Sequence, residues 1–190
     1  MTPGIPASST GKSRAVRPGS LTGAWALASL FVFSTLASAE TPADPKAVKE
    51  VNGKYLDAAG NPTYNVKADG TVDWYTYSGF RRYHSECHVC HGPDGEGSTY
   101  APALKDSLKT MGYAEFYGIV VGGRQNVSAA SEKVMPAFAD NKNVMCYLDD
   151  IYVYLRARST DAVPRGRPLK HDPRPPGFGE AESACLGIKE

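Results

Sequence analysis

The sequence predicts a mainly α-helical domain, preceded by a strand-forming segment and followed by an extended, proline-rich tail. Three observations favour this: a compact cysteine and histidine motif within residues 83–97, an apolar stretch at 113–123 that ends in two glycines, and a strongly periodic segment at 141–158. The 190 residues suffice for one domain of ordinary size, and a net charge of +1 indicates no nucleic-acid partner.

The first 39 residues differ in kind from the rest. Three basic residues precede an apolar run at 21–36, and the small residues Ala-Ser-Ala follow at 37–39. This order is typical of a secretory signal peptide, cleaved after Ala39, so the mature protein is expected to be exported. The alternative is a transmembrane anchor, but a span needs ~20 apolar residues, and this run is shorter and interrupted by Gly, Ser and Thr. We therefore expect a protein that is not integral to the membrane.

The remaining chain falls into three parts. In residues 40–76, turn-forming pairs such as Asn52-Gly53 separate short runs rich in Tyr, Val and Thr, so an extension of one or two small β-hairpins is expected. Residues 77–160 are expected to form the helical domain, with a first helix that runs from about Tyr77 into Cys87. Residues 161–190 are rich in Pro, Gly and Arg without periodicity, which indicates an extended tail.

The segment from Asn141 to Arg158 has the clearest helical pattern. Its apolar stripe recurs at i, i+4, i+7 and i+11, through residues 144, 148, 151 and 155. One continuous helix is expected to bury this stripe and to leave Cys146 on its outer side. Residues 126–140 have no such pattern and are expected to form a loop.

Cys87, Cys90 and His91 form a C-x-x-C-H motif. On a helical turn the three side chains share one face, so two thiols can add to the two vinyl groups of a haem while the imidazole reaches its iron. A zinc site is one alternative, but it needs a second short ligand pair, and the other two cysteines are far apart. A redox-active dithiol of the thioredoxin type, which belongs to a βαβ pattern, and a chance match are the others. The expected cofactor is haem c, held covalently, one per chain.

Met135 is the candidate for the sixth ligand of the iron. It lies well downstream of His91, ahead of the last helix and directly before Pro136. Met/His ligation fills both axial positions, which suits electron transfer and disfavours substrate chemistry at the iron. Met111 follows the attachment motif too closely, and Met145 lies beside the apolar stripe of the last helix. An open or His-ligated sixth position is the alternative.

Residues 77–158 resemble the class I c-type cytochromes. Gly79 and Tyr83 resemble the glycine and the aromatic residue by which the first helix of that family crosses the last, and the Tyr-Leu pair at 154–155 resembles its partner on the opposing helix. The resemblance implies a mainly α class I cytochrome c fold around one covalent haem, here with an N-terminal β-hairpin extension and a C-terminal tail.

Two loops of this sequence also resemble those of the family. Residues 101–104 resemble the loop in which the carbonyl of Pro102 would accept a hydrogen bond from Nδ1 of His91, and residues 134–138 resemble the loop of the distal ligand. The implied cofactor-binding residues are Cys87, Cys90, His91, Pro102 and Met135. Of these, His91 and Met135 would bind the iron.

Residues 52–92 resemble, more closely, the methanol-metabolism-related c-type cytochromes. This resemblance implies a periplasmic electron-transfer protein and not an enzyme. It would accept electrons from a dehydrogenase of methanol or other alcohols that depends on pyrroloquinoline quinone (PQQ), and would pass them to a downstream cytochrome or oxidase. The alternatives are a general electron donor to a terminal oxidase, unrelated to alcohol oxidation, and a haem sensor or enzyme with an open sixth position.

The same resemblance, with four cysteines in the chain, implies a fate for the remaining two. Cys146 and Cys185 would form a disulfide that ties the tail across the outer side of the last helix. Two free thiols are the alternative.

Overall fold

The computed structural model of the chain describes residues 44–128 and 131–188. The signal sequence expected at residues 1–39 lies outside them. None of the helices in the described part of the chain has the length and apolar content of a membrane span.

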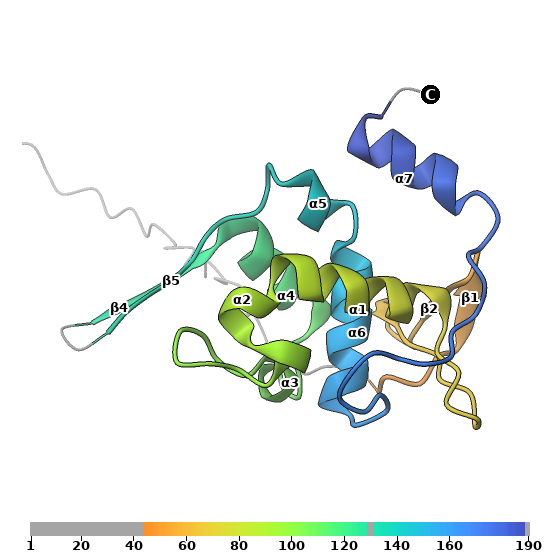
Figure 1. Ribbon diagram of the computed structural model, residues 1–190, viewed down its shortest axis with the longest axis horizontal. Helices are drawn as coiled ribbons and strands as arrows, with labels where there is room; N and C mark the ends of the chain where they lie inside the picture. The colour runs from red at the N-terminus through yellow and green to blue at the C-terminus, as the bar shows by residue number, and fades with distance from the viewer. Residues whose placement is uncertain (1–43, 129–130, 189–190) are drawn as a thin grey trace, which may run out of the picture. The chain divides into compact units, whose positions relative to one another are not determined.

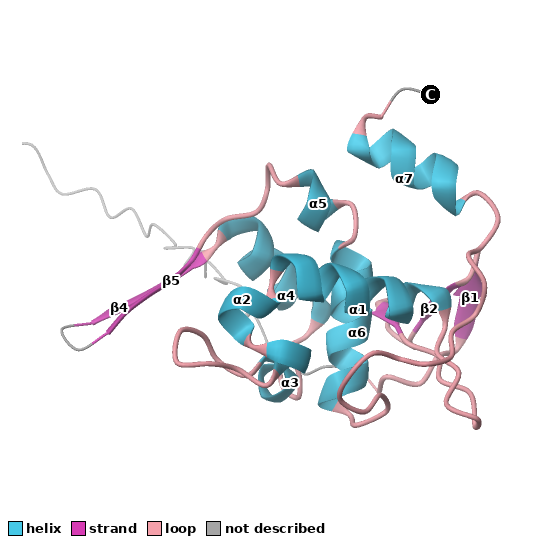
Figure 2. Ribbon diagram, viewed as in Figure 1, coloured by secondary structure: helices cyan, strands magenta, loops and turns pink. Residues whose placement is uncertain are grey.

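The described residues form a mainly helical structure with two small antiparallel sheets (Figures 1 and 2). The helices are α1 (Trp74–Glu86), α2 (His88–His91), α3 (Leu104–Ser107), α4 (Tyr113–Gly122), α5 (Lys142–Met145), α6 (Leu148–Ser159) and α7 (Phe178–Leu186), with a 3-10 turn η1 (Pro93–Gly95). The strands are β1 (Lys49–Val51), β2 (Lys54–Leu56), β3 (Pro62–Thr63), β4 (Arg124–Ser128) and β5 (Ser131–Met135).

The crossing of α1 and α6 forms the centre of the fold. At Gly79 a Cβ atom would lie only 1.8 Å from the carbonyl oxygen of Asp150, so the two backbones approach more closely than any side chain permits. Tyr83 and Tyr154 are fully buried beside the crossing, with ring centroids 5.7 Å apart. This arrangement matches the helix contact that the family resemblance implies.

Helix α1 begins three residues earlier than the sequence predicts, because Asp73 caps it. The Asp73 carboxylate accepts a hydrogen bond of 2.9 Å from the backbone N–H of Thr76 and another of 2.6 Å from its hydroxyl. The helix ends at Glu86, and Cys87 joins it to α2.

The periodic segment from Asn141 is not one helix, which corrects the prediction. It divides into α5 and α6 at Tyr147, whose φ of −127° and ψ of 18° leave the helical region. The ring of Tyr147 is buried under the guanidinium of Arg82, 3.5 Å from its centroid, and its hydroxyl donates to Glu182 at 2.6 Å. These tertiary contacts override the local helical pattern. The apolar stripe is nevertheless buried as expected.

The expectation of a loop at residues 126–140 is partly wrong, because β4 and β5 form a hairpin there (Figure 2). Gly123, with φ of +74°, ends α4 and turns the chain so that Arg124 pairs with Met135. Backbone hydrogen bonds define the ribbon, and the polar residues along it do not alternate with apolar ones, so the sequence carries no strand signal.

The C-terminal tail is not wholly extended, which is a third correction. Residues 163–176 contain no helix, but the chain then forms α7 between Gly177 and Gly187, both with positive φ. Cys185 in α7 is bonded to Cys146 with an S–S distance of 2.06 Å, and their Cα atoms are 5.8 Å apart. The disulfide is therefore present, and it fastens a helix and not an extended strand.

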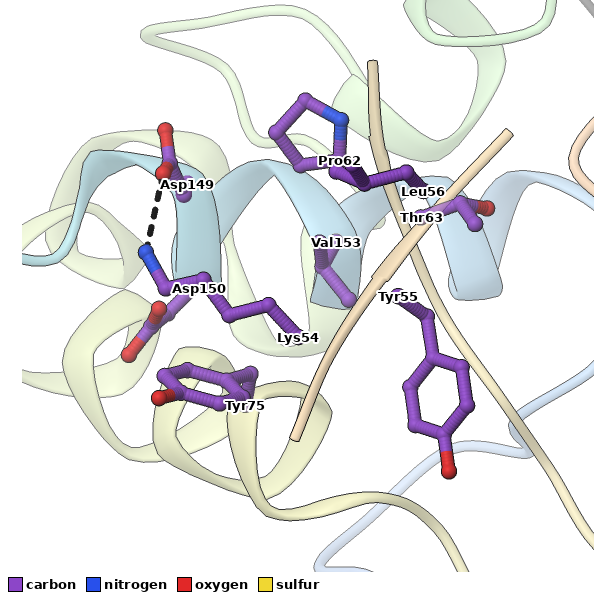
Figure 3. Close-up of a pocket in the computed structure, with 9 residues that line it drawn as sticks. All are labelled: Lys54, Tyr55, Leu56, Pro62, Thr63, Tyr75, Asp149, Asp150 and Val153. Carbon is purple, nitrogen blue, oxygen red and sulfur yellow. Dashed lines mark hydrogen bonds and ion pairs between the residues drawn. The ribbon is translucent and has the colours of Figure 1, made fainter. Parts of the chain in front are cut away.

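The N-terminal segment forms a three-stranded sheet in the order β1-β2-β3. Asn52 and Gly53 both have positive φ, as a two-residue hairpin turn requires. The sheet lies against α6, where the ammonium of Lys54 is 3.1 Å from the carboxylate of Asp149 (Figure 3). The pocket between them is about 40 Å³, room for a few water molecules at most. This sheet thus covers one edge of the helical core.

Candidate functional site

The C-x-x-C-H motif lies where α1 passes into α2. The backbone N–H of Cys87 donates to Tyr83 at 2.9 Å, and that of His91 donates to the carbonyl of Cys87 at 3.0 Å, so the helical path continues through the motif. Cys87 is half-buried and Cys90 is exposed. Both thiols are free, whereas Cys146 and Cys185 are bonded to each other and cannot complete a zinc site with them.

The thiol of Cys87 does not have the properties of a redox-active dithiol. Burial raises its pKa to about 12, with smaller contributions from Glu86 and Cys90. A redox-active cysteine needs a lowered pKa, because the thiolate is the nucleophile. The environment of Cys87 therefore does not favour the thiolate that a redox-active dithiol requires.

His91 is held in the form that a metal ligand requires. Its side chain is buried, and Nδ1 lies 3.0 Å from the carbonyl oxygen of Pro102. A carbonyl can only accept, so Nδ1 carries the proton and Nε2 carries the lone pair. Burial lowers the pKa of His91, which outweighs the opposite effect of the Pro102 hydrogen bond. The imidazole is thus neutral, with Nε2 available to an iron.

The loop that carries Pro102 is fastened to the motif through Ser98. The Ser98 hydroxyl donates to the carbonyl of Cys90 and accepts from the N–H of Tyr100 at 3.0 Å. The Ser98 N–H donates to the carbonyl of Ala101 at 2.9 Å. These bonds fix the distance between the attachment helix and the Pro102 carbonyl. The role of Ser98 depends on the folded loop and could not be predicted from the sequence.

A second loop, residues 92–97, closes the other side of His91. The N–H of Gly97 donates to the carbonyl of His91 at 2.7 Å, and the hydroxyl of Tyr83 donates to the carbonyl of Gly92 at 2.6 Å. A Cβ at Gly92 would lie 2.1 Å from the carbonyl oxygen of Gly97, so only glycine permits this closure.

The charged residues of this loop are paired inside the protein. Arg158, of which 3% is exposed, donates to the carbonyl of Asp94 at 3.2 Å and to the carboxylate of Glu96 at 2.8 Å. Lys105 binds the other oxygen of Glu96 at 2.7 Å and, by that hydrogen bond, lowers the pKa of Glu96. The role of Arg158 could not be predicted, because nothing in the helical sequence pattern distinguishes it from a solvated arginine.

Met135 is the last residue of β5, on an element separate from the attachment motif. It is half-buried against the core, as are Met111 and Met145. A Cβ at Gly123 would lie 2.7 Å from the carbonyl oxygen of Met135, so the end of α4 confines the backbone there. The structure brings Cys87, Cys90, His91 and Pro102 together through α2 and the hydrogen bond from His91 to Pro102, whereas Met135 lies on the separate β4–β5 hairpin, so its ligation of the iron stays a prediction.

Comparison with known proteins identifies the family to which the chain belongs. No protein-family model matches the chain. The chain is 41% identical over 112 residues to cytochrome c-555 of Methylococcus capsulatus (strain ATCC 33009 / NCIMB 11132 / Bath), a match of 58% of this chain and 81% of that relative. The chain belongs to the class I c-type cytochromes. The present chain is also 56% identical over 135 residues to cytochrome c-553I of Paracoccus denitrificans, a match of 71% of this chain and 60% of that longer relative.

A solved structure gives the same result for the fold. The crystal structure of the c-type cytochrome XoxG from Methylobacterium extorquens AM1 superposes with a TM-score of 0.69 at 54% identity, covering 79% of this chain and 95% of that one. Cytochromes of this type carry haem c covalently. The free thiols of Cys87 and Cys90 and the neutral, oriented imidazole of His91 fit that cofactor. The chain has one C-x-x-C-H motif and therefore binds one haem c.

Proposed function

We propose that this c-type cytochrome is a periplasmic carrier that accepts electrons from a PQQ-dependent methanol or alcohol dehydrogenase and delivers them to a downstream cytochrome or oxidase. The breadth of the likeness to cytochrome XoxG supports the proposal. Residues 77–160 make up 84 of the 190 residues, so a match over 79% of the chain includes segments outside that domain. The N-terminal segment within residues 52–92 is also where the sequence resembles methanol-metabolism-related cytochromes.

The proposed roles of the site residues follow from their geometry. The sulfurs of Cys87 and Cys90 form the two thioether bonds, Nε2 of His91 binds the iron, and the carbonyl of Pro102 fixes the imidazole ring. The thioether of Met135 is the proposed sixth ligand. When bound, the haem iron takes up and releases one electron. With two protein ligands on the iron no position is left for a substrate, so the chain acts as a redox partner and not as the dehydrogenase.

Two large apolar side chains are exposed on the surface near Cys90. Val89 is 77% exposed between the two cysteines, and Tyr100 is 75% exposed on the loop that Ser98 fastens to Cys90. Charged groups of the neighbouring loop, Asp94 and Glu96, are engaged by internal partners. We expect the electron donor to dock here by apolar contact, so its encounter rate should depend only weakly on ionic strength.

Variants on this surface test the proposed donor. The purified cytochrome is mixed with a PQQ-dependent alcohol dehydrogenase, and haem reduction is followed after alcohol is added. Tyr100→Ala should slow reduction about tenfold or more without a change in reduction potential, because it removes exposed apolar contact area. Leu169→Ala, at a tail position that is 95% exposed, is the matched control and should leave the rate unchanged. Equal rates for the two variants would place the docking surface elsewhere.

A further inference from the structure

His84 lies on the last turn of α1, three residues before Cys87, and its two ring nitrogens differ in their surroundings. Nδ1 is 2.8 Å from the carbonyl oxygen of Phe80. Because a carbonyl only accepts, Nδ1 carries a proton in either charge state of the ring. The proton that the ring gains or loses is therefore the one on Nε2.

Nε2 of His84 faces two atoms of Asp94, each suited to one charge state. The backbone N–H of Asp94 is 3.4 Å away and can donate to Nε2 when the imidazole is neutral. The Oδ1 atom of Asp94 is also 3.4 Å away and can accept from Nε2 when the imidazole is protonated. Both forms thus have a partner without rearrangement of the backbone.

Asp94 is held rigidly in this position. Its side chain is buried, and its φ of +57° is unusual for a residue other than glycine. The hydroxyl of Tyr154 donates to the same Oδ1 at 3.2 Å, and Arg158 donates to its carbonyl at 3.2 Å. Arg165, after α6, is 3.7 Å from Oδ2. This tethering keeps Asp94 facing His84 whether or not the imidazole is charged.

Other titratable and charged groups surround the pair from each packed element. On α1 the Tyr83 ring is 5.2 Å from the His84 ring, and on α2 the His88 ring is 5.7 Å away. On α6 the Tyr154 ring is 6.1 Å away, while Glu96 beyond η1 is neutralised by Arg158 and Lys105. The carboxylate of Asp94 is the acidic group in contact with His84. The side chain of His84 is 25% exposed, so protons exchange with solvent.

His84 is also close to the residue that is expected to attach the haem. Residues i and i+3 of a helix lie on one face, so His84 is one turn from the sulfur of Cys87 that attaches the haem. Asp94 follows the iron ligand His91 by three residues. The net charge at the haem falls by one when an electron enters, and a lower positive charge nearby favours the protonated form of a base.

We propose that His84 is a redox-linked proton site, which binds a proton from solvent at Nε2 as the haem is reduced and releases it on oxidation. The electron comes from the donor protein and the proton from water, so charge is partly compensated at the site. The proposal rests on haem attachment at Cys87 and is independent of the donor's identity. Its consequence is a reduction potential that falls as pH rises across the titration of His84.

Potentiometry of the holoprotein over pH 5 to 8, where histidine side chains titrate, tests the proposal. The wild-type potential should fall with pH, and the potential of His84→Gln should be constant over the same range. His88→Gln is the matched control, because Nδ1 of His88 also binds a backbone carbonyl oxygen, that of His84, at 3.1 Å. This variant should keep the wild-type dependence of the potential on pH. A pH-independent wild-type potential, or a slope that survives in His84→Gln, would overturn the proposal.

Nuclear magnetic resonance of the wild-type protein provides a measurement that needs no variant. The ring protons of His84 should titrate at a higher pH in the reduced protein than in the oxidised one. Identical titration curves in the two states would contradict the proposal even if His84→Gln failed to fold. Asp94→Asn should move both curves to lower pH, because it removes the acceptor charge. If the protein shows the spectrum of a covalently bound haem but its reduction potential does not depend on pH, the proton site is refuted and the electron-carrier function is unaffected.

Discussion

Removal of the Cys146–Cys185 disulfide should cost the protein about 4 kcal/mol of unfolding free energy. The two cysteines are 39 residues apart, and closing a loop of that length restricts the unfolded chain by about this amount in the chain-entropy model. The folded tail has further anchors, since Glu182 accepts from Arg82 at 3.0 Å and from Tyr147 at 2.6 Å. These contacts should keep α7 in place in the double variant Cys146→Ser/Cys185→Ser, so the loss falls mainly on the unfolded state.

Guanidinium unfolding of the oxidised holoprotein, followed by far-ultraviolet circular dichroism, measures this loss. Glu182→Gln is the control, because it weakens the same tail contacts while the covalent loop stays closed, and it should cost about 1 to 2 kcal/mol. A loss below about 1 kcal/mol in the double serine variant would refute the loop-closure reasoning. An equal loss in both variants would show that packing of α7, and not the cross-link, stabilises the fold.

Three further predictions concern the helix crossing, a buried acid and the iron. Gly79→Ala should destabilise the holoprotein by several kcal/mol, because its Cβ would meet a carbonyl oxygen at 1.8 Å. Gly118→Ala has open space around its Cβ and should stabilise the protein by up to about 1 kcal/mol. Thermal unfolding of both variants tests this difference. Burial raises the pKa of Asp150 to about 7, above the ordinary carboxyl value of its unfolded state, so wild-type stability should fall as pH rises from about 4 through 7. Asp150→Asn should lose that dependence and gain up to about 4 kcal/mol at pH 8, and an unchanged pH profile of denaturant midpoints would contradict this. Met135→Ala should abolish the near-infrared band of a methionine-ligated ferric haem and Met111→Ala should retain it; the reverse result would reassign the sixth ligand.

The sequence predicts those parts of the fold whose signal is local. The apolar stripe of the last helix was identifiable because its period is that of a helix, and its four members are buried. The break at Tyr147 was not, since it depends on Arg82 and Glu182, which are distant in the chain. The β4–β5 hairpin and α7 were missed for a related reason: short elements with little apolar periodicity are defined by pairing, a cross-link and flanking glycines.

The candidate site divides in the same way. Cys87, Cys90 and His91 are adjacent in sequence, so their shared face could be deduced from helical geometry alone. The groups that orient them, Ser98 and Arg158, act through hydrogen bonds to backbone carbonyls of folded loops. The spacing of residues in the sequence does not indicate such hydrogen bonds, so the roles of Ser98 and Arg158 can be recognised only in the structure.

Stopped-flow mixing with a PQQ-dependent methanol dehydrogenase tests whether this cytochrome accepts electrons from such an enzyme. The dehydrogenase is first reduced with excess methanol and then mixed with the oxidised cytochrome, while the haem absorbance is recorded. We expect complete reduction, one electron per cytochrome, at least as fast as the turnover of the dehydrogenase. The proposed function is wrong if this and other PQQ-dependent alcohol dehydrogenases leave the cytochrome oxidised while an unrelated electron donor reduces it readily.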